Sequence, residues 1–294
     1  MFKYKMLLVA LSFATLLAVG CNENPIDPVV TVPNAPTGLM ANSLGADMIG
    51  IKWTAPTGEY TGYKIKLSAT GMTDTTYTIT DKATTMFSVS GLTEGTRYTF
   101  AVSSVNGTTS SANAATITWS PASRFTQIKG NNIQVYEYSS LKGSGLRLFD
   151  PSTGAPAVYS KEAGGDKWDI AFNNDGTPDS IDAGSPRLLY TLLNPRITLV
   201  GKITPANSLD EVYETGDLTA SAETYFSLPN VSTTGYVFVV KTAEGNYAKV
   251  FVKQLLGKIL QGTILDDQYV TVEISYQSVA NVPHAGTRGS VIGG

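Results

Sequence analysis

Apolar and polar residues alternate over short runs along most of this chain, and residues that favour turns separate the runs. In the first half the alternating runs are Ile49–Trp53, Tyr63–Leu67, Thr75–Thr80, Met86–Val89, Tyr98–Val105 and Ala114–Trp119. A period of two is typical of strands that bury one face, and no useful window keeps the spacing of an amphipathic helix. The pattern therefore predicts an all-β fold.

The second half predicts further strands. Residues 236–241 and 247–253 flank a turn around Gly245, which indicates a hairpin. In the return strand we expect Ala248, Val250 and Val252 to face the core and Lys249 to lie on a half-solvated face. Residues 269–277 repeat the alternation, and residues 167–172 add an apolar strand.

The amino terminus has the pattern of a secretory signal. Lys3 and Lys5 precede the uncharged apolar run 6–19, which is shorter than the about 20 residues of a transmembrane helix. Residues 17–21 (Leu-Ala-Val-Gly-Cys) resemble a bacterial lipobox, which implies cleavage before Cys21 and lipid on its thiol. The alternative is an unmodified cysteine in a plain signal. We expect a signal peptide over 1–20 and an extended tether over 21–32, rich in proline.

Composition limits the function classes. The full sequence has 294 residues, 42% of them hydrophobic, so the part that follows the signal can bury two ordinary cores. We expect domains over 33–121 and 124–277 with a flexible tail over 278–294. A formal net charge of −3 without a basic cluster argues against a nucleic-acid partner. Cys21 is the only cysteine and His284 the only histidine, which excludes intrachain disulfides and most catalytic triads and zinc sites. We predict that the protein is not an enzyme.

The first domain carries a recognisable set of core positions. Trp53, Tyr63, Leu92 and Tyr98, preceded by Pro36, Gly38 and Leu39, resemble the pattern of a fibronectin type III domain. The resemblance implies structural roles: a core tryptophan, a core tyrosine, and a leucine with a corner tyrosine whose hydroxyl reaches the backbone. It also implies a spacer or an interaction module.

The second domain resembles another family. Its strand Lys167-Trp-Asp-Ile-Ala-Phe172, the hairpin around Lys241-Thr-Ala-Glu-Gly-Asn246 and the last strand, Tyr269–Gln277, are similar to those of HmuY-like haem-binding lipoproteins. The resemblance implies an all-β domain, lipid-anchored in the outer membrane at the cell surface, which captures haem for an outer-membrane haem transporter. Trp168 and Phe172 are expected in the core.

Haem ligands are the weak point of this resemblance. All methionines precede Arg124, and no histidine lies in the body of the second domain, so the usual axial ligands are missing there. Tyrosinate can ligate ferric iron, and the candidates are Tyr136, Tyr138, Tyr159, Tyr190 and Tyr213. The alternative is an adhesion lipoprotein that binds surface glycans or proteins and has no haem role.

An oxygen-rich loop suggests a second ligand. Asp175, Asp179 and Asp182 could hold calcium, a hard cation that takes carboxylate ligands. The spacing fits no EF-hand, and Asn-Asp-Gly is equally typical of a plain turn. We keep both interpretations open.

Overall fold

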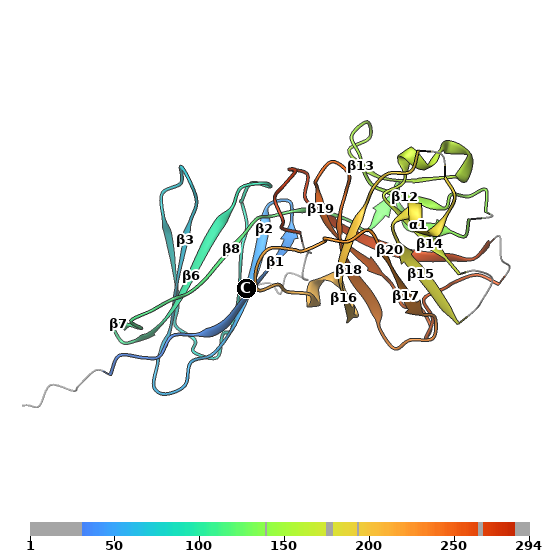
Figure 1. The fold of residues 1–294 in the computed structure, drawn as a ribbon. Helices are drawn as coiled ribbons and strands as arrows, with labels where there is room; N and C mark the ends of the chain where they lie inside the picture. Colours follow the sequence, from blue (N-terminus) through green and yellow to red (C-terminus); the bar gives the residue numbers. More distant parts are fainter. Residues whose placement is uncertain (1–30, 139, 175–178, 193, 264–266, 286–294) are drawn as a thin grey trace, which may run out of the picture.

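The computed structural model describes residues 31–138, 140–174, 179–192, 194–263 and 267–285, which form two β-sandwich domains placed end to end (Figure 1). Cys21 and Asp175 lie outside the described residues. Of the described residues, none belongs to a helix long and apolar enough to cross a membrane.

The first domain packs two antiparallel sheets face to face. Its strands are β1 (Thr37–Gly45), β2 (Met48–Thr54), β3 (Gly62–Ser68), β4 (Thr75–Ile79), β5 (Met86–Val89), β6 (Tyr98–Asn106), β7 (Thr109–Ser110) and β8 (Ala115–Trp119). One sheet has the order β1-β2-β5, and the other has the order β4-β3-β6-β7 with β8 on β6. The inward residues of both sheets form one core, so the strands predicted from alternation are confirmed.

The second domain is a larger sandwich. Its strands are β9 (Ser123–Phe125), β10 (Gln127–Ile128), β11 (Asn131–Tyr136), β12 (Gly145–Asp150), β13 (Ala155–Tyr159), β14 (Ile170–Asn173), β15 (Ser180–Gly184), β16 (Leu199–Ala206), β17 (Tyr225–Pro229), β18 (Gly235–Lys241), β19 (Tyr247–Val252) and β20 (Tyr269–Tyr276). Short helices η1 (Lys161–Ala163), η2 (Gly165–Lys167), α1 (Pro186–Leu189) and η3 (Leu209–Glu211) connect them. The sheet β10-β11-β20-β19-β18-β16 packs against the sheet β13-β12-β14-β15-β17. The all-β prediction is confirmed.

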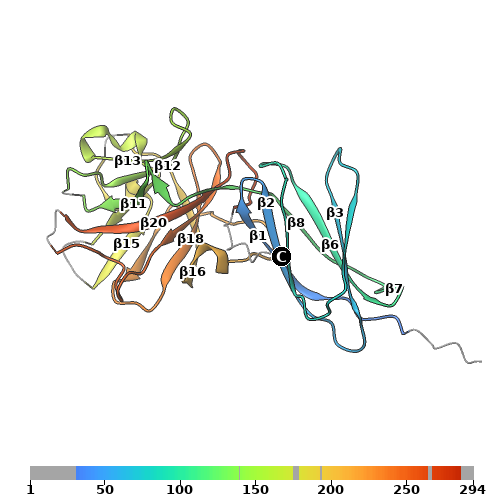
Figure 2. The ribbon, with the colours of Figure 1, turned by 180° about the vertical axis from the view of Figure 1, so that it is seen from behind.

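The two domains share a continuous apolar core. Leu218, Ala220, Val239 and Ala285 of the second part of the chain belong to the same buried cluster as the inward residues of the first sandwich. Figures 1 and 2 show from opposite sides that β1 lies on the side of the first domain that faces the second domain. An apolar core that crosses the boundary indicates one rigid unit, since separate modules usually meet through a smaller and more polar interface.

A polar cluster lies within this boundary. We call it the domain seam, and it consists of Trp119, Glu214, Lys249, Gln277 and His284. Lys249 in β19 is fully buried, and its Nζ donates to the carbonyl of Val212 at 2.7 Å and lies 3.3 Å from the Glu214 carboxylate. The same Nζ lies 5.9 Å from the ring centre of Trp119 in the first domain. The prediction that Lys249 lies on a half-solvated face was therefore wrong, because the first domain covers that face.

Backbone hydrogen bonds cross the seam as well. The backbone N–H of Ala41 in β1 donates to the carbonyl of Glu214 at 2.8 Å, and the N–H of Glu214 donates to the carbonyl of Ala41 at 2.9 Å. This pair of hydrogen bonds attaches the segment after η3 to the first domain. Gln277 donates from Nε2 to the carbonyl of Pro121 at 2.8 Å. The side chains of Lys249 and Gln277 therefore have fixed partners on both sides of the seam.

The segment 278–285 was expected to belong to a flexible tail, but in the structure its end is packed into the seam. His284 is fully buried, with its ring centre 4.6 Å from that of Trp119. The carbonyl of Pro283 accepts the N–H of Leu218 at 2.9 Å. The glycine-rich composition of the last residues suggested a flexible end, and no sequence pattern indicates that the first domain supplies Trp119 as a packing surface for His284.

The Lys249 ion pair leads to a stability prediction. Replacing Lys249 with Ala leaves the buried Glu214 carboxylate with Lys202 as its remaining cation, and we expect a loss of about 3 kcal/mol in the free energy of unfolding. The double variant Lys249→Met with Glu214→Gln should recover most of this loss, because it removes both charges. Urea denaturation measures both values.

The matched control is the exposed pair of Lys66 and Asp74, 2.7 Å apart. Lys66→Ala should cost less than about 1 kcal/mol, since exposed pairs contribute little. Equal losses for Lys66→Ala and Lys249→Ala would contradict the assigned role of the seam.

His284 leads to a pH prediction. Burial lowers the pKa of His284 to about 4, although the Asp217 carboxylate, 3.7 Å from Nε2, opposes the shift. Above pH 6.5 the imidazole is neutral in both states. As the pH falls from 6.5 to 4, the imidazole of His284 is protonated in the unfolded chain but stays largely neutral in the folded chain. The free energy of unfolding should therefore fall by about 3 kcal/mol. Urea denaturation at stepped pH values should show this slope, and His284→Gln should remove it. A variant slope equal to that of the native chain would disprove the assignment.

Candidate functional site

Three aromatic rings gather on the second domain, at the end far from the first. The rings of Tyr138 and Tyr190 are stacked, with centres 4.2 Å apart and planes at 18°. The ring of Trp168 stands edge-on to both, at 6.4 Å from Tyr138 and 6.1 Å from Tyr190. We call these residues the aromatic cluster. Trp168 is fully buried, whereas both tyrosines are partly exposed, so the cluster reaches the surface through its tyrosines.

Fixed backbone positions hold the cluster together. Tyr138 follows β11, and its backbone N–H donates to the buried carboxylate of Glu137, which also accepts the backbone N–H of Asn174. Tyr190 ends α1 and donates its hydroxyl to the carbonyl of Phe172 at 2.5 Å. These contacts tie both tyrosines to the core strand β14.

Trp168 fits against a glycine. A Cβ at Gly145 would lie within 2.1 Å of the indole, so no larger residue can occupy this position of β12 without displacing the ring. The indole Nε1 of Trp168 is buried and has no hydrogen-bond acceptor among the described residues. Buried donors without an acceptor are rare in native proteins. An unpaired donor therefore lies within the ring cluster.

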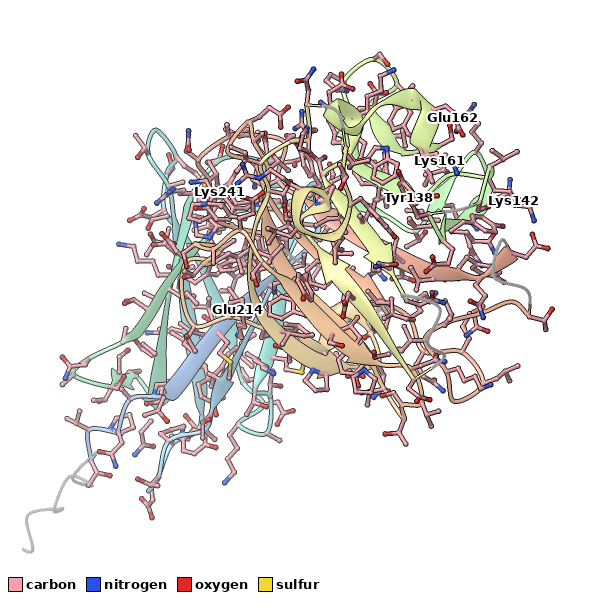
Figure 3. All side chains as sticks on the ribbon, turned by 45° about the vertical axis from the view of Figure 1, so that its right-hand side comes forward. Tyr138, Lys142, Lys161, Glu162, Glu214 and Lys241 are labelled. Atoms are coloured by element: carbon pink, nitrogen blue, oxygen red, sulfur yellow. The ribbon has the colours of Figure 1, made fainter. Side chains whose placement is uncertain are left out.

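Lysine side chains surround the tyrosines. Lys161 Nζ lies 5.4 Å from the ring centre of Tyr138. Lys142 Nζ lies 5.2 Å from the ring centre of Tyr136, which packs against Tyr269 at 5.2 Å. Figure 3 shows Tyr138, Lys142 and Lys161 on the same side of the second domain, with Glu162 at its edge. Lys142 is paired with Asp267 at 2.5 Å, so the positive charge next to Tyr138 comes from Lys161. An aromatic surface beside a cation favours a flat ligand that carries negative charge.

The structure divides the five candidate tyrosines. It brings Tyr138 and Tyr190 together and places Tyr136 nearby, with its hydroxyl 3.0 Å from Gln134 Oε1. Tyr159 donates to Asp150 at 2.5 Å, and this hydrogen bond, followed by burial, raises the pKa of Tyr159. Tyr213 lies beside the seam below Lys52, and burial, followed by the charge of Asp210, raises its pKa. A raised pKa opposes tyrosinate, so Tyr159 and Tyr213 are poor ligands for ferric iron.

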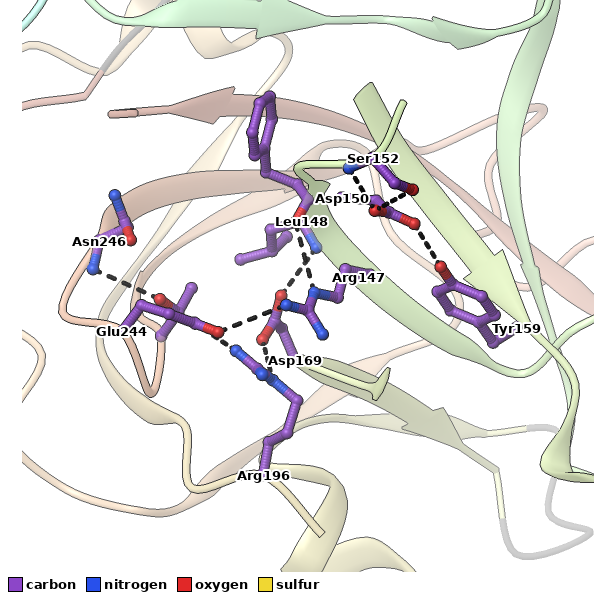
Figure 4. A network of polar contacts seen from close by, with 11 residues as sticks. Arg147, Leu148, Asp150, Ser152, Tyr159, Asp169, Arg196, Glu244 and Asn246 are labelled. Carbon is purple, nitrogen blue, oxygen red and sulfur yellow. Dashed lines mark hydrogen bonds and ion pairs between the residues drawn. The ribbon is translucent and has the colours of Figure 1, made fainter. Parts of the chain in front are cut away.

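Next to the cluster, a charged network joins the two sheets (Figure 4). The buried Asp169 accepts the N–H of Leu148 at 2.9 Å and pairs with Arg196 Nε at 2.7 Å. Arg196 also pairs with Glu244, which lies 3.3 Å from Arg147. The sequence alone did not reveal this pairing, because the partners come from three distant segments.

A groove of about 640 Å³ lies beside this network. It is lined by Ile197, Leu199, Lys241, Thr242, Ala243, Glu244, Gly245 and Asn281. The Glu244 carboxylate pairs with Arg196 and Arg147, so we assign it a structural role.

The residues proposed for calcium are only partly described. Asp179 is exposed just before β15, and Asp182 lies within β15 opposite Asn173. In the part of the chain that the structure describes, no three histidine, cysteine, aspartate or glutamate residues cluster as metal ligands would. Calcium binding stays a prediction.

The residues assigned structural roles lie in the two cores. Trp53, Tyr63 and Tyr98 are buried in the first domain, where Leu92 packs against them. The Tyr98 hydroxyl accepts the backbone N–H of Thr93 at 2.9 Å, which is the contact of a corner tyrosine. Trp168 and Phe172 are buried in the second domain.

The strand order and the tyrosine corner agree with a comparison of the sequence with known families. The fibronectin type III family model matches residues 34–118. The first domain is a fibronectin type III domain. The model ends before the second domain, so it covers only the first of the two sandwiches. Fibronectin type III domains are in general binding or adhesion modules and are typically non-catalytic.

Solved structures of such domains are similar to this chain. The fibronectin type III domain of human collagen alpha-1(XX) has 20% sequence identity, with 34% of this chain and 95% of that chain covered and a TM-score of 0.30. The FN5 domain of Drosophila Lar has 24% identity, with 31% and 98% covered and a TM-score of 0.26. No curated protein matches the sequence.

Proposed function

We propose that this chain is a non-catalytic binding lipoprotein, anchored by lipid on Cys21, that captures a flat ligand at the aromatic cluster. The stacked pair of Tyr138 and Tyr190 carries the proposal, since partly exposed, fixed rings are costly to leave open to water and useful for stacking on a ligand. The lipobox-like residues 17–21 support the anchor.

The arrangement of the domains suits capture at a surface. Thr31 begins the described chain beside Asn106 at the end of the fibronectin type III domain that lies away from the second domain (Figure 1). The aromatic cluster lies at the opposite end of the molecule (Figure 3). The seam makes the fibronectin type III domain a stiff spacer, which holds the cluster away from the tether.

Haem, or a related porphyrin, is the ligand that we favour. Tyr138 has no hydrogen bond from its hydroxyl to another described residue, so among the five tyrosines it is the most available ligand for ferric iron. Lys161, whose Nζ lies 5.4 Å from the ring centre of Tyr138, is available to pair with a carboxylate of a porphyrin, whereas Lys142 already pairs with Asp267 at 2.5 Å. The similarity of the second domain to HmuY-like lipoproteins supports this choice and suggests delivery to an outer-membrane haem transporter.

A second candidate is a surface glycan or protein. The presence of a fibronectin type III domain favours it, because such domains are in general binding or adhesion modules. Partly exposed tyrosine rings can also stack on sugars. A glycan array probed with the chain from Asn22 onward would detect this function directly.

A haem titration tests the favoured proposal. Ferric haem added to the chain from Asn22 onward should shift the Soret band at micromolar protein, and Tyr138→Phe should weaken binding by about tenfold or more through loss of the iron ligand. Tyr159→Phe is the matched control and should leave affinity unchanged, because its hydroxyl is already bonded to Asp150. No Soret shift with the native chain would eliminate haem as the ligand.

A further inference from the structure

A hairpin at the edge of the second domain presents apolar side chains to solvent. Leu255 and Lys258 exchange backbone hydrogen bonds at 2.8 and 3.0 Å, which leaves Leu256 and Gly257 as a two-residue turn. Leu256 is 100% exposed, Leu255 is 37% exposed, and the neighbouring Val231 is 75% exposed. Val231 pairs with Lys258, so the three side chains lie together. We call Val231, Leu255 and Leu256 the leucine tip.

Leucine is a poor choice for this turn. Leu256 has φ +52° and Gly257 has φ +82°, the left-handed values of a type I′ turn, where asparagine, aspartate or glycine is preferred. A leucine here has a left-handed backbone conformation that residues with a Cβ disfavour. Because Leu256 is fully exposed, no burial of its side chain offsets this cost. Both costs fall on the isolated chain, which suggests that an external apolar phase compensates them.

The tip is rigid rather than loose. Asn230 accepts the N–H of Ile259 with its carbonyl at 2.8 Å and the N–H of Leu260 with its side chain at 2.8 Å. Gln261 donates to the carbonyls of Leu255 and Lys258. These hydrogen bonds fix the turn in a projecting conformation. The leucine tip can therefore insert into a partner, but it cannot enclose a ligand.

The residues of the tip match a lipid surface. They are aliphatic, and the exposed Lys258 stands beside them, which is the composition of segments that enter the membrane interface while lysine reaches the headgroups. Protein interfaces concentrate their binding energy in tryptophan, tyrosine and arginine, and leucine is under-represented there. We therefore propose that the leucine tip inserts into the membrane at which the chain is held.

The position of the tip agrees with this orientation. The tip follows β19, whose end pairs with the start of β18, and the start of β18 pairs with the end of β16. In Figure 1, β16 runs to the lower edge of the second domain, and the first described residues also leave the first domain at its lower side. A membrane along this side would leave the aromatic cluster, in the upper part of the second domain, facing away.

Three aliphatic side chains bind a bilayer only weakly, so insertion requires that the chain is already held there. The experiment therefore supplies the tether independently of lipid on Cys21. The chain from Asn22 onward, with an N-terminal hexahistidine tag, is held on vesicles of phosphatidylethanolamine and phosphatidylglycerol that contain a nickel-chelating lipid. It contains no cysteine, so Leu256→Cys gives one attachment point for an environment-sensitive fluorophore.

We expect the emission of the fluorophore at position 256 to shift to shorter wavelength and to increase on vesicles. Leu141→Cys is the control, because Leu141 is 77% exposed elsewhere on the second domain, and its emission should stay unchanged. No shift at position 256, or equal shifts at both positions, would overturn the proposal, including the case in which the tip docks on a protein. Failure of lipidation or of haem binding would leave this result unaffected, so the proposals fail separately.

A second variant guards against damage to the fold. Asparagine suits this turn better than leucine, so Leu256→Asn should raise the urea midpoint of unfolding. On vesicles, residues 253–260 of the tethered Leu256→Asn chain should be less protected from hydrogen exchange than the same residues of the tethered native chain. Equal protection of the native and the Leu256→Asn chains on vesicles would contradict insertion.

Discussion

The buried ion pair of Lys249 and Glu214 is the interaction on which the shape of this molecule depends. An ammonium group cannot lie in a dry interior without partners, and Lys249 finds them only where η3, β19 and the fibronectin type III domain meet. Buried pairs contribute little net stability and are instead costly to break. Both residues of the pair belong to the second domain, and the first domain meets them through the ring of Trp119 and through the backbone hydrogen bonds between Ala41 and Glu214. The shared apolar core supplies most of the attraction between the two sandwiches.

This constraint gives the fibronectin type III domain a specific role. Such a domain is often pictured as a separate module on a linker, but here Trp119 and Ala41 are packed against the second domain. The direction of the aromatic cluster relative to the tether is then set by the fold and not by free motion of one domain relative to the other. Binding at the cluster and insertion of the leucine tip are compatible, because they lie on different sides of the same rigid body.

Much of the fold followed from local pattern. Period-two alternation predicted β2, β3, β6, β18 and β20 because apolar residues recur at every second position on the face that enters the sandwich. In β18 and β20 the second face is largely buried as well. The same pattern predicted a half-solvated position for Lys249, which is wrong. Alternation distinguishes the two faces of a strand, but it does not show whether another domain covers the polar face. Strands such as β11, β15 and β16 were not predicted, because their sequences are short or interrupted by glycine, proline and polar residues.

The candidate site was predictable in part. Tyrosine was identified as the available ligand type by the absence of histidine and methionine in the second domain. The pairing of Tyr138 with Tyr190, however, depends on the end of β11, in one sheet, meeting the end of α1, which follows β15 of the other sheet. The partners of Asp169 were also invisible, since Arg196 and Glu244 are distant in the chain. Leu256 was missed because an exposed leucine is ordinary until its backbone conformation is known.

Differential scanning calorimetry of the chain from Asn22 onward tests the central claim, that both sandwiches are one cooperative unit. A shared core and a buried ion pair predict a single transition whose calorimetric and van't Hoff enthalpies agree. Two resolved transitions, or a van't Hoff enthalpy about half the calorimetric value, would show that the domains unfold independently and would contradict the account.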